Sequence, residues 1–465
     1  MIAAAARARG GGRGRDRVGR RAGSLVAVAV AVAVAAAALA ACERSTEIVL
    51  GEDFRTVLDP LPAPTRAIDV LLVVDTSGSM APEQAALVAA AGDQLFAQLT
   101  TDLGEPADLH LAVISTDVGV GVDGVPGCPA TSWDGRFRVG AVGVTCPVQG
   151  TFLIDRDDGA GGRSTNYQGT LGEAFACAAS LGVDGCGFEQ PLEAVRRALD
   201  GRHPENAGFR RADALLLVLF LTDEDDCSAF DPAIYGDPEA GPTSPLGPRT
   251  SFRCFEFGVV CDPDQPRRFG EKARCRPRLD SPYLTPPTEY IEFLRGLTPT
   301  AGLVMLAGMY GSIDPVVVVP DPASPERPSL EPCVAPGTDV EAAPAIRLDA
   351  VVREFPSRAV FAPLCEAPMS QRLYRVTRAA TGVMARRPCL FGELGTDTVT
   401  ERCRAFAVAG ATRRAVERCD GAGGDCFEIA ASPACDYTPS GLAASYRGTL
   451  GAGERLVVEC LTRVD

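Results

Sequence analysis

The sequence predicts an α/β fold in which helices flank a mostly parallel β-sheet. Continuous apolar runs, such as IDVLLVVD at 68–75 and ALLLVLFL at 214–221, are typical of strands that are buried on both faces of a sheet. Segments with helical periodicity separate these runs, and strands that alternate with helices favour parallel pairing. The chain has 465 residues, of which 46% are hydrophobic, so it is long enough and apolar enough to bury a sizeable core.

Each expected element rests on a local pattern between residue 68 and residue 384. The helix after the first strand is rich in alanine and has Pro82 near its start, where proline is tolerated because first-turn N–H groups lack a helical partner. In order, we expect a strand at 68–75, a helix from Pro82 to about Leu99, a strand at 109–116, helices at about 170–181 and 190–200, a strand at 214–221, a helix at 288–297, a strand at 301–311, a helix at 345–355, a short strand at 358–364 and a helix at 370–384.

Three segments interrupt this alternation inside a predicted domain at 68–388. The first, about 117–168, is rich in glycine, and we expect FRVGAVGV and TFLID in it to be short strands at a sheet edge. The second, about 227–286, is rich in proline and shows no helical or strand periodicity, and the third, about 311–340, is also rich in proline. We interpret them as insertions, of which the cysteine-rich 227–286 would be held by disulfides rather than by a core of its own. The last segment, 389–465, holds six cysteines and little apolar periodicity, which predicts a small Cys-rich C-terminal module.

The N-terminus has the form of an export signal. Residues 1–41 begin with arginines and continue in the apolar run Leu25–Ala41, which ends in the sequence LAAC. This ending resembles the lipobox of bacterial lipoproteins, and the resemblance implies that Cys42 is lipidated and becomes the mature N-terminus. The alternative is a transmembrane anchor, although the run barely reaches the length of a bilayer span. Residues 42–67 would then be a proline-rich tether.

This interpretation places the protein in the cell envelope as a membrane-anchored lipoprotein, exposed to the periplasm or the cell surface. Glu43 differs from the aspartate that is usually tied to retention in the inner membrane, so the outer membrane is preferred.

The cysteine count agrees with an oxidising compartment. The chain has seventeen cysteines, and lipidation of Cys42 would leave sixteen, enough for eight disulfides. Zinc clusters are disfavoured because close Cys-x-x-Cys pairs are absent and the sequence holds only two histidines. The connectivity cannot be deduced from the sequence. The pairs closest in the chain are the favoured candidates, namely Cys128 with Cys146, Cys177 with Cys186, and Cys261 with Cys275.

The charge distribution excludes one class of partner. The formal net charge is −15, and residues 1–41 contribute +6 through seven arginines and one aspartate, so the rest of the chain carries −21. Such an acidic chain repels phosphate backbones, and we therefore expect no nucleic-acid binding.

The segment VVDTSGSM at 73–80 contains the strongest site signal. Asp75, Ser77 and Ser79 alternate along an extended segment, so they begin as three oxygen-bearing side chains on one side. The backbone must curl to bring them around one small ion, and Gly78 is the residue that allows a tight turn there. Hard oxygen donors favour Mg²⁺, Ca²⁺ or Mn²⁺ over zinc or copper. A plain helix-capping turn is the alternative interpretation.

A second acidic segment is expected at the same edge of the sheet. The strand at 214–221 ends in Thr222-Asp223, and the carboxyl ends of parallel strands are where open α/β sheets bind ligands. Asp223 should therefore emerge beside Asp75 if the two strands are neighbours. The acidic run DEDDCSAFD at 223–231 offers a second cation position, although such runs are more often solvated loops.

DTSGSM after a buried strand, followed by a helix and later by a strand that ends in LTD, resembles the von Willebrand factor type A domain over roughly residues 68–385. The resemblance implies a doubly wound, Rossmann-like sheet and a metal-ion-dependent adhesion site. In that site Ser77 and Ser79 would bind the ion directly, and Asp75 and Asp223 directly or through water. The family's threonine has no clear counterpart: Glu189, in GFEQPLEAV, stands at the equivalent place, and Thr170, in GTLGEAF, is the alternative.

The resemblance also implies a function, which is protein binding or adhesion through the bound cation. A partner's acidic side chain would displace water from the open coordination position of the ion. Two rivals are a structural envelope protein whose metal site only stabilises the fold and, less favoured, an envelope hydrolase. Catalysis is not expected, because the sequence has no Gly-x-Ser-x-Gly elbow, P-loop or His-Glu-x-x-His motif.

Overall fold

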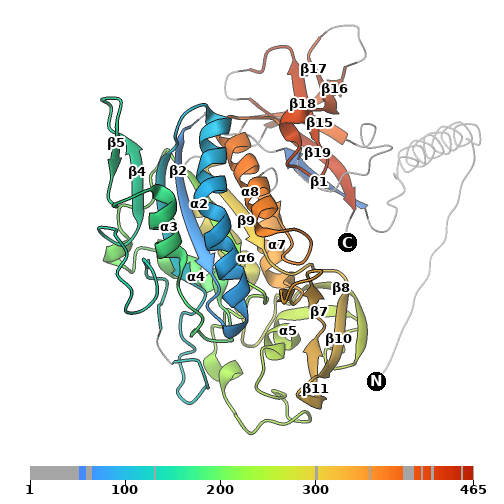
Figure 1. Ribbon diagram of the computed structural model, residues 1–465. Helices are drawn as coiled ribbons and strands as arrows, with labels where there is room; N and C mark the ends of the chain where they lie inside the picture. Colours follow the sequence, from blue (N-terminus) through green and yellow to red (C-terminus); the bar gives the residue numbers. More distant parts are fainter. Residues whose placement is uncertain are drawn as a thin grey trace, which may run out of the picture. The chain divides into compact units, whose positions relative to one another are not determined.

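The computed structural model describes residues 52–58, 65–129, 132–298, 302–355, 358–390, 403–409, 412–419, 424–451 and 454–463 (Figure 1). The predicted signal peptide, Cys42 and most of the tether lie outside the described residues. Among the helices that the structure describes, none is both long and apolar enough to cross a membrane. Residues Asp53–Asp465 cluster as one compact unit.

The largest sheet has seven strands and carries the predicted site. Its strand order is β14-β9-β6-β2-β3-β4-β5. The first five of these pair in parallel, whereas β4 and β5 pair antiparallel. The bounds are β2 (Ala67–Val74), β3 (Asp108–Ser115), β4 (Leu153–Asp157), β5 (Arg163–Thr165), β6 (Leu215–Leu221), β9 (Val304–Met309) and β14 (Ala359–Phe361).

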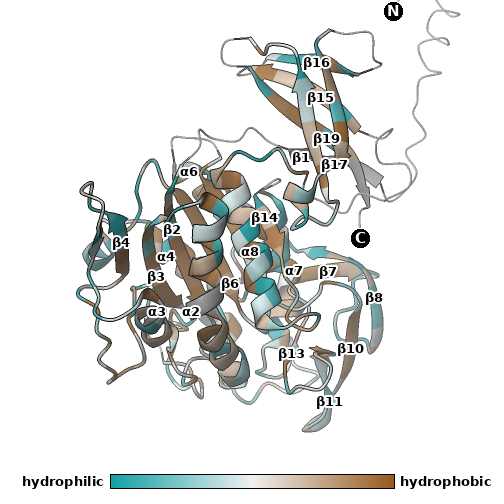
Figure 2. Cartoon of the chain, turned by 45° about the horizontal axis from the view of Figure 1, so that its top comes forward, coloured by the Kyte–Doolittle hydropathy of each residue, from teal (hydrophilic) through white to brown (hydrophobic). Residues whose placement is uncertain are grey.

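Different helices cover the two faces of β2. Successive strand residues point to opposite faces, so alternate residues of β2 belong to different apolar clusters. Val70 and Leu72 pack in a cluster with residues of α2 (Ala81–Leu103), α3 (Leu171–Ala179) and α8 (Met369–Met384). Leu71 and Val73 pack in a second cluster with residues of α4 (Pro191–Leu199), α6 (Pro287–Gly296) and α7 (Ile346–Arg353). Figure 2 shows the central strands β2, β3 and β6 as hydrophobic, as double-sided burial requires.

The proline-rich segments contain strands that the sequence did not predict. In the segment 227–286 lie α5 (Phe252–Gly258), β7 (Val259–Asp262) and β8 (Gly270–Pro277), and in the segment 311–340 lie β10 (Val316–Asp321) and β11 (Ser324–Leu330). These strands form one antiparallel sheet of order β11-β10-β8-β7. A two-stranded sheet joins β12 (Cys333–Val334) to β13 (Glu341–Ala342).

A six-stranded sheet contains the C-terminal residues and β1, in the order β1-β19-β15-β16-β17-β18. β15 pairs antiparallel with β19 and with β16, β17 pairs antiparallel with β18, and β16 pairs parallel with β17. The bounds are β1 (Glu52–Leu58), β15 (Cys403–Ala409), β16 (Thr412–Arg418), β17 (Cys426–Ala431), β18 (Leu442–Arg447) and β19 (Arg455–Arg463). Short 3₁₀ helices occur at Gly78–Met80, Pro204–Asn206, Pro232–Tyr235 and Pro433–Cys435.

The predicted fold class, a doubly wound, mostly parallel sheet flanked by helices, is wrong for this chain. About 25% of the residues are helical and about 30% lie in strands, and the strands are spread over four sheets in the described part of the chain. None of these sheets is purely parallel. The prediction failed because it expected no strands in the proline-rich segments 227–286 and 311–340 or in the C-terminal residues, whereas these regions contribute most of the antiparallel strands.

Eight disulfides connect sixteen cysteines, as the cysteine count predicts. They join Cys128–Cys186, Cys146–Cys177, Cys227–Cys254, Cys261–Cys275, Cys333–Cys365, Cys389–Cys435, Cys403–Cys460 and Cys419–Cys426. Of the three predicted pairs only Cys261–Cys275 is correct. The pairs Cys128–Cys146 and Cys177–Cys186 are wrong, because the two bonds are nested in the chain: Cys128 pairs with Cys186, and Cys146 between them pairs with Cys177 of α3.

Candidate functional site

The loop after β2 is fixed by backbone and side-chain hydrogen bonds around Asp75. The Asp75 N–H donates to the carbonyl of Leu221, 2.9 Å away, which holds the end of β2 against β6. The Asp75 carboxylate is fully buried; its Oδ1 accepts from the Ser77 N–H at 2.7 Å and its Oδ2 accepts from the Thr222 hydroxyl at 2.8 Å. The hydroxyls of Ser77 and Ser79 lie 3.1 Å apart. The predicted curl of the loop is therefore present.

The curl does not depend on glycine at position 78, contrary to the prediction. Gly78 begins the 3₁₀ helix Gly78–Met80, its φ is not in the left-handed region, and an added Cβ would meet no atom within 4 Å. A 3₁₀ turn of this kind is open to any residue, so the backbone does not require glycine here.

Asp223 emerges beside this loop because β2 and β6 are paired neighbours. Val74 of β2 lies opposite Leu221 of β6 in a parallel register, so the residues that follow both strands leave the sheet at one edge. Asp223 interacts with the side chains of Ser79 and Asp75. It is 7% exposed, and its buried Oδ1 has no hydrogen-bond partner.

Glu189 lies in the same group of side chains, between the ends of β3 and β6. The adjoining Gln190 N–H donates to the Thr116 carbonyl at 3.1 Å, and the Cys227 N–H donates to the Glu189 carbonyl at 2.7 Å. The Glu189 side chain is 1% exposed, and both of its carboxylate oxygens lack a hydrogen-bond partner. Its electrostatic interactions with Glu224, Asp75 and Asp223 place it among the predicted ligands.

Thr170, the alternative to Glu189, has a different role. It is the exposed N-cap of α3, where its hydroxyl accepts from the Glu173 N–H and the Glu173 carboxylate accepts from the Thr170 N–H. This capping box uses the Thr170 side chain to stabilise the start of the helix. In the part of the chain that the structure describes, the side chain of Thr170 contacts Glu173 and not the other predicted site residues.

Three side chains near the site were missed by the sequence reasoning. Glu83, in the first turn of α2, is 2% exposed and has an unpartnered Oε2; Glu224 directly follows Asp223; and Thr116, at the end of β3, has a buried hydroxyl without a partner. An acidic residue in the first turn of a helix is common because it interacts with the helix dipole, so Glu83 gave no distinct signal. Glu224 belongs to an acidic run, and such runs are more often solvated loops.

The carboxylates of this group repel one another in a buried setting. Burial is the largest cause of the raised pKa of Asp75 and of Glu189, followed by repulsion from Asp223 in the first case and from Glu224 in the second. Burial also raises the pKa of Glu83 and of Glu224 to about 7. No arginine or lysine of the described residues forms an ion pair with any of these groups. Without a cation these buried carboxyl groups therefore tend to hold protons, and a bound cation would favour their ionised forms and balance the negative charge.

The donor set fits a hard divalent cation. Carboxylate and hydroxyl oxygens come together from the loop after β2, from the loop after β6 and from Glu189. Among the described residues, no three or more His, Cys, Asp or Glu side chains are already grouped around one metal position. Coordination at this edge would therefore depend on the serine hydroxyls as well as on the carboxylates.

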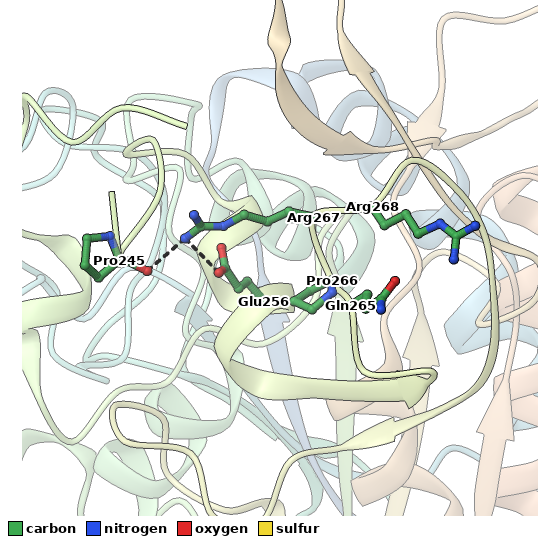
Figure 3. Close-up of a pocket in the computed structure, with 6 residues that line it drawn as sticks. All are labelled: Pro245, Glu256, Gln265, Pro266, Arg267 and Arg268. Carbon is green, nitrogen blue, oxygen red and sulfur yellow. Dashed lines mark hydrogen bonds and ion pairs between the residues drawn. The ribbon is translucent and has the colours of Figure 1, made fainter. Parts of the chain in front are cut away.

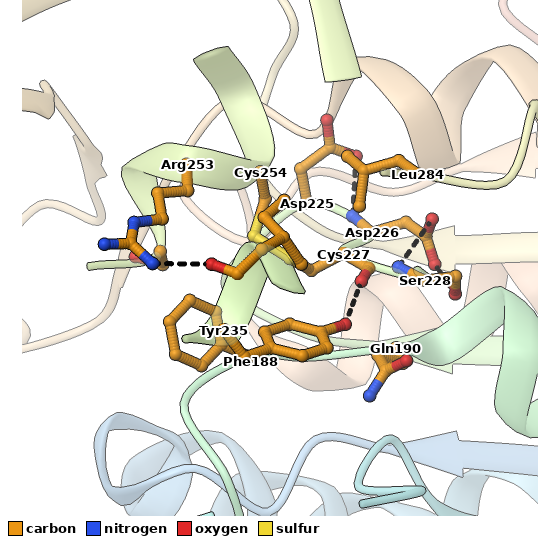
Figure 4. Close-up of a disulfide and its surroundings, with 12 residues drawn as sticks. Phe188, Gln190, Asp225, Asp226, Cys227, Ser228, Tyr235, Arg253, Cys254 and Leu284 are labelled. Carbon is orange, nitrogen blue, oxygen red and sulfur yellow. Dashed lines mark hydrogen bonds between the residues drawn. A yellow bond between two sulfur atoms is a disulfide. The ribbon is translucent and has the colours of Figure 1, made fainter. Parts of the chain in front are cut away.

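Asp225 and Asp226, the next two acidic residues of the chain, already have hydrogen-bond and ion-pair partners in the structure. The Asp225 carboxylate accepts from the N–H groups of Arg347 and Leu348 at the start of α7. Asp226 forms a buried ion pair with Arg347, at 3.1 Å, and its Oδ2 accepts from the Ser228 N–H at 3.2 Å. Figure 4 shows Asp225 and Asp226 beside the Cys227–Cys254 disulfide. These two carboxylates anchor α7 and are not available to a second cation.

A pocket elsewhere in the structure carries none of the predicted site residues. It is lined by Pro245, Glu256, Gln265, Pro266, Arg267 and Arg268 (Figure 3). The guanidinium of Arg267 pairs with Glu256 at 2.8 Å and donates to the Pro245 carbonyl at 2.8 Å. Two of its three charged side chains, Arg267 and Glu256, are thus paired with each other.

Comparisons with known proteins leave the family open. No protein-family model matches the chain, and no curated protein matches it. The similar solved structures include proximal thread matrix protein 1 from the mussel byssus, with TM-score 0.28, 9% identity and coverage of 69% of this chain and 49% of that chain. They also include two crystal structures of the pilus adhesin SpaC from Lactobacillus rhamnosus GG, with TM-scores of 0.29 and 0.31, 10% identity, and coverage of 89% of this chain and 42% and 43% of that chain.

This chain spans less than half the length of each of these proteins. TM-scores near 0.3 at such low identity carry no argument about fold or function.

Proposed function

We propose that the chain binds a divalent cation, Mg²⁺ or alternatively Ca²⁺ or Mn²⁺, where β2 and β6 end, and uses the cation to bind a protein partner. The observation that carries the proposal is the set of buried, unpartnered carboxylate oxygens of Glu189 and Asp223 beside Asp75, with no ion pair to balance them. A buried carboxylate without a partner costs several kcal/mol, on the order of the penalty for any buried uncompensated ion. A cation removes that cost.

The coordination follows from the contacts of each side chain. Both oxygens of Asp75 are engaged by Ser77 and Thr222, so Asp75 orients the loop and reaches the ion through water. Ser77 and Ser79 supply hydroxyl oxygens, and Asp223 and Glu189 supply carboxylate oxygens. A hexacoordinate ion held on one side by these groups keeps an open position for an acidic side chain of the partner.

The loop's resemblance to the metal-ion-dependent adhesion site of von Willebrand factor type A domains supports the proposal at the level of the DTSGSM loop. The proposed setting is the cell envelope, where a lipidated Cys42 would anchor the chain, preferably in the outer membrane, and leave the site exposed to the periplasm or cell surface. The partner would be a protein that offers an acidic side chain.

The double variant Ser77→Ala with Ser79→Ala tests the proposal. It removes two hydroxyl ligands without removing a buried carboxylate, and we expect it to lower cation affinity at least tenfold while the protein stays folded. Isothermal titration calorimetry with Mg²⁺, Ca²⁺ and Mn²⁺ measures the affinity, and a pull-down from envelope extracts with and without EDTA measures partner binding. Thr170→Ala is the control, because the Thr170 hydroxyl caps α3. Its removal should leave cation binding unchanged.

Two results would contradict the proposal. One is a wild-type protein that takes up none of the three ions, and the other is partner binding that persists unchanged in EDTA. A wild-type protein that binds an ion and keeps its partners in EDTA, yet melts at a lower temperature there, would favour a purely structural metal.

A further inference from the structure

Two exposed valines lie on one turn of the glycine-rich insertion, in the segment FRVGAVGV that the sequence predicts as a strand. Val142 is 77% exposed, the highest value among the large apolar side chains that the structure describes, and Val144 is 53% exposed. The Val144 N–H donates to the Ala141 carbonyl at 3.1 Å, and Gly143 has the positive φ, 83°, that type II turns require at this position. Exposed turns are usually built from glycine, proline and polar residues. Two aliphatic side chains on residues 141–144, the valine turn, therefore favour a contact surface over a simple chain reversal.

The valine turn is held firmly against α3. The Cys146–Cys177 bond joins the segment that follows the turn to α3, and the Gly140 N–H donates to the Ala178 carbonyl at 3.0 Å. Gly140 also has a positive φ of 85°, and a Cβ there would lie 2.8 Å from the Cys146 sulfur. A surface that is fixed in advance loses little conformational entropy when a partner binds. The two valines are therefore suited to bind a partner without rearrangement.

The valine turn lies beside the stretch of chain that leads to Glu189. The Ala141 Cβ is 3.8 Å from the position that a Cβ at Gly182 would occupy. The Gly182 carbonyl accepts from the Gln84 side-chain amide at 2.9 Å, and the same amide donates to the Asp75 carbonyl at 2.8 Å. Consecutive contacts thus connect the valine turn with the loop after β2, so the turn flanks the proposed cation site.

The segment around the valine turn is uncharged. None of the residues 139–154 is charged, whereas the chain after residue 41 carries a formal charge of −21. The adjoining residues 180–188 include one charged residue, Asp184. Most of such an acidic chain repels an acidic partner, and the repulsion is weakest over an uncharged segment. A partner that presents an acidic side chain to the cation is therefore accepted most readily on the side of the valine turn.

We propose that the partner of the cation site is a protein segment in which the acidic side chain is flanked by bulky aliphatic side chains. These aliphatic side chains pack on Val142 and Val144 while the carboxylate binds the cation. The proposal rests on the proposed function, because the cation supplies the attraction for the acidic group. Apolar burial adds affinity without adding charge, so the valine turn selects among acidic segments.

Fluorescein-labelled peptides that differ in one residue test this proposal. Each probe has one aspartate in a short glycine–serine peptide, with leucine at one position within four residues of the aspartate, and the reference peptide has serine in place of leucine. Fluorescence anisotropy with the full chain is measured in saturating Mg²⁺, Ca²⁺ or Mn²⁺. We expect at least one leucine probe to bind about tenfold more tightly than the serine reference, because a leucine that is largely buried contributes about this factor. EDTA should abolish the binding of every probe.

Val142→Ser with Val144→Ser should remove the preference for leucine. Because neither valine is a proposed ligand of the ion, the cation affinity in calorimetry and the affinity for the serine reference should stay unchanged. The matched control is Phe269→Ser with Leu279→Ser, which removes apolar side chains that are 48% and 60% exposed beside the two ends of β8 and should keep the preference.

Four results would overturn the apolar contact surface and leave cation binding standing. They are cation uptake without binding of any probe, equal binding of leucine and serine probes by the wild-type protein, a preference that survives in the Val142→Ser, Val144→Ser variant, and a preference that is lost equally in the control. No uptake of Mg²⁺, Ca²⁺ or Mn²⁺ would instead overturn the proposed function, and this inference with it.

Discussion

Gly185 is a residue at which the loop carrying Glu189 contacts the loop after β2. Its N–H donates to the Thr76 carbonyl at 2.7 Å, and a Cβ at this position would lie 2.1 Å from the Thr76 hydroxyl and 2.8 Å from the Thr76 carbonyl oxygen. Gln84 reinforces the contact, because its side-chain amide donates to the carbonyls of Asp75 and Gly182 at 2.8 and 2.9 Å. The spacing of the proposed ligands depends on this close approach.

Replacing Gly185 by alanine should therefore weaken cation binding. The added methyl group must push the loop away from Thr76, since the atoms it meets include backbone, and we expect a loss of cation affinity of tenfold or more in calorimetry. Gly187→Ala is a matched control from the same loop, because a Cβ there meets no atom within 4 Å and its φ is not in the left-handed region. Equal affinities in the two variants would show that the close approach does not position the site.

The sequence was informative about those site residues that follow strands. Asp75 and Asp223 could be placed at one edge because both follow apolar runs that pair in parallel. Thr170 could have been rejected from its own pattern, because Thr170-x-x-Glu173 is the signature of a capping box. Glu83 and Glu224 could not be found, because an acidic first turn and an acidic loop have ordinary structural explanations and only the fold reveals their burial.

Among the elements, two disulfides join the loops of the site to one apolar cluster. Cys128–Cys186 ends three residues before Glu189, and Cys227–Cys254 begins four residues after Asp223. All four cysteines pack in a cluster that also contains Phe188, Tyr235 and Leu284. The Tyr235 hydroxyl donates to the Cys227 carbonyl at 2.7 Å (Figure 4). These connections hold the loop before Glu189 and the loop after Asp223 at a fixed spacing.

Removal of the Cys227–Cys254 bond should thus weaken cation binding as well as lower the free energy of unfolding. In the double variant Cys227→Ser with Cys254→Ser we expect a loss of about 3 kcal/mol of unfolding free energy, as for other loops of this size, and a weaker cation affinity. The control is Cys419→Ser with Cys426→Ser, which opens a disulfide in the C-terminal sheet and should leave cation affinity unchanged. Chemical denaturation and calorimetry give the two quantities; equal cation affinities in both variants would contradict the positioning role.

The strands that could not be predicted from the sequence are those in which most side chains are polar or exposed. β8 reads GEKARCRP, and most of its residues are exposed or half-buried, so it has neither an apolar run nor a clean alternation. Its pairing with β7 and β10, beside the Cys261–Cys275 bond, supplies what the strand itself lacks. The buried strands β2, β3 and β6 were predictable because burial on both faces demands continuous apolar sequence.

At the scale of the whole molecule, the C-terminal residues are packed into the main core. Cys435 and Tyr437 belong to the same apolar cluster as residues of β2, α2 and α8. Arg378 of α8 pairs with Asp436 at 2.9 Å, and the Cys389–Cys435 bond closes the connection covalently. A Cβ at Gly382 of α8 would lie 2.0 Å from the Tyr437 hydroxyl oxygen, so the ring lies directly against the helix. The rest of the six-stranded sheet has an apolar cluster of its own, which includes Phe427 and Val458, so the predicted boundary at residue 389 stays a prediction.

Tyr437→Ala tests whether this contact stabilises the whole chain. Tyr437 is 6% exposed, and truncation of a buried aromatic side chain costs about 3 to 5 kcal/mol because it leaves a cavity. We expect a loss of about that size in urea denaturation, within a single transition, because the ring connects the C-terminal residues to α8. Tyr374→Ala is the matched control: this tyrosine is also on α8 but is 41% exposed, so its removal should cost less than about 1 kcal/mol. Two separate transitions, of which Tyr437→Ala shifts only the smaller, would mean that the C-terminal residues fold independently of the seven-stranded sheet.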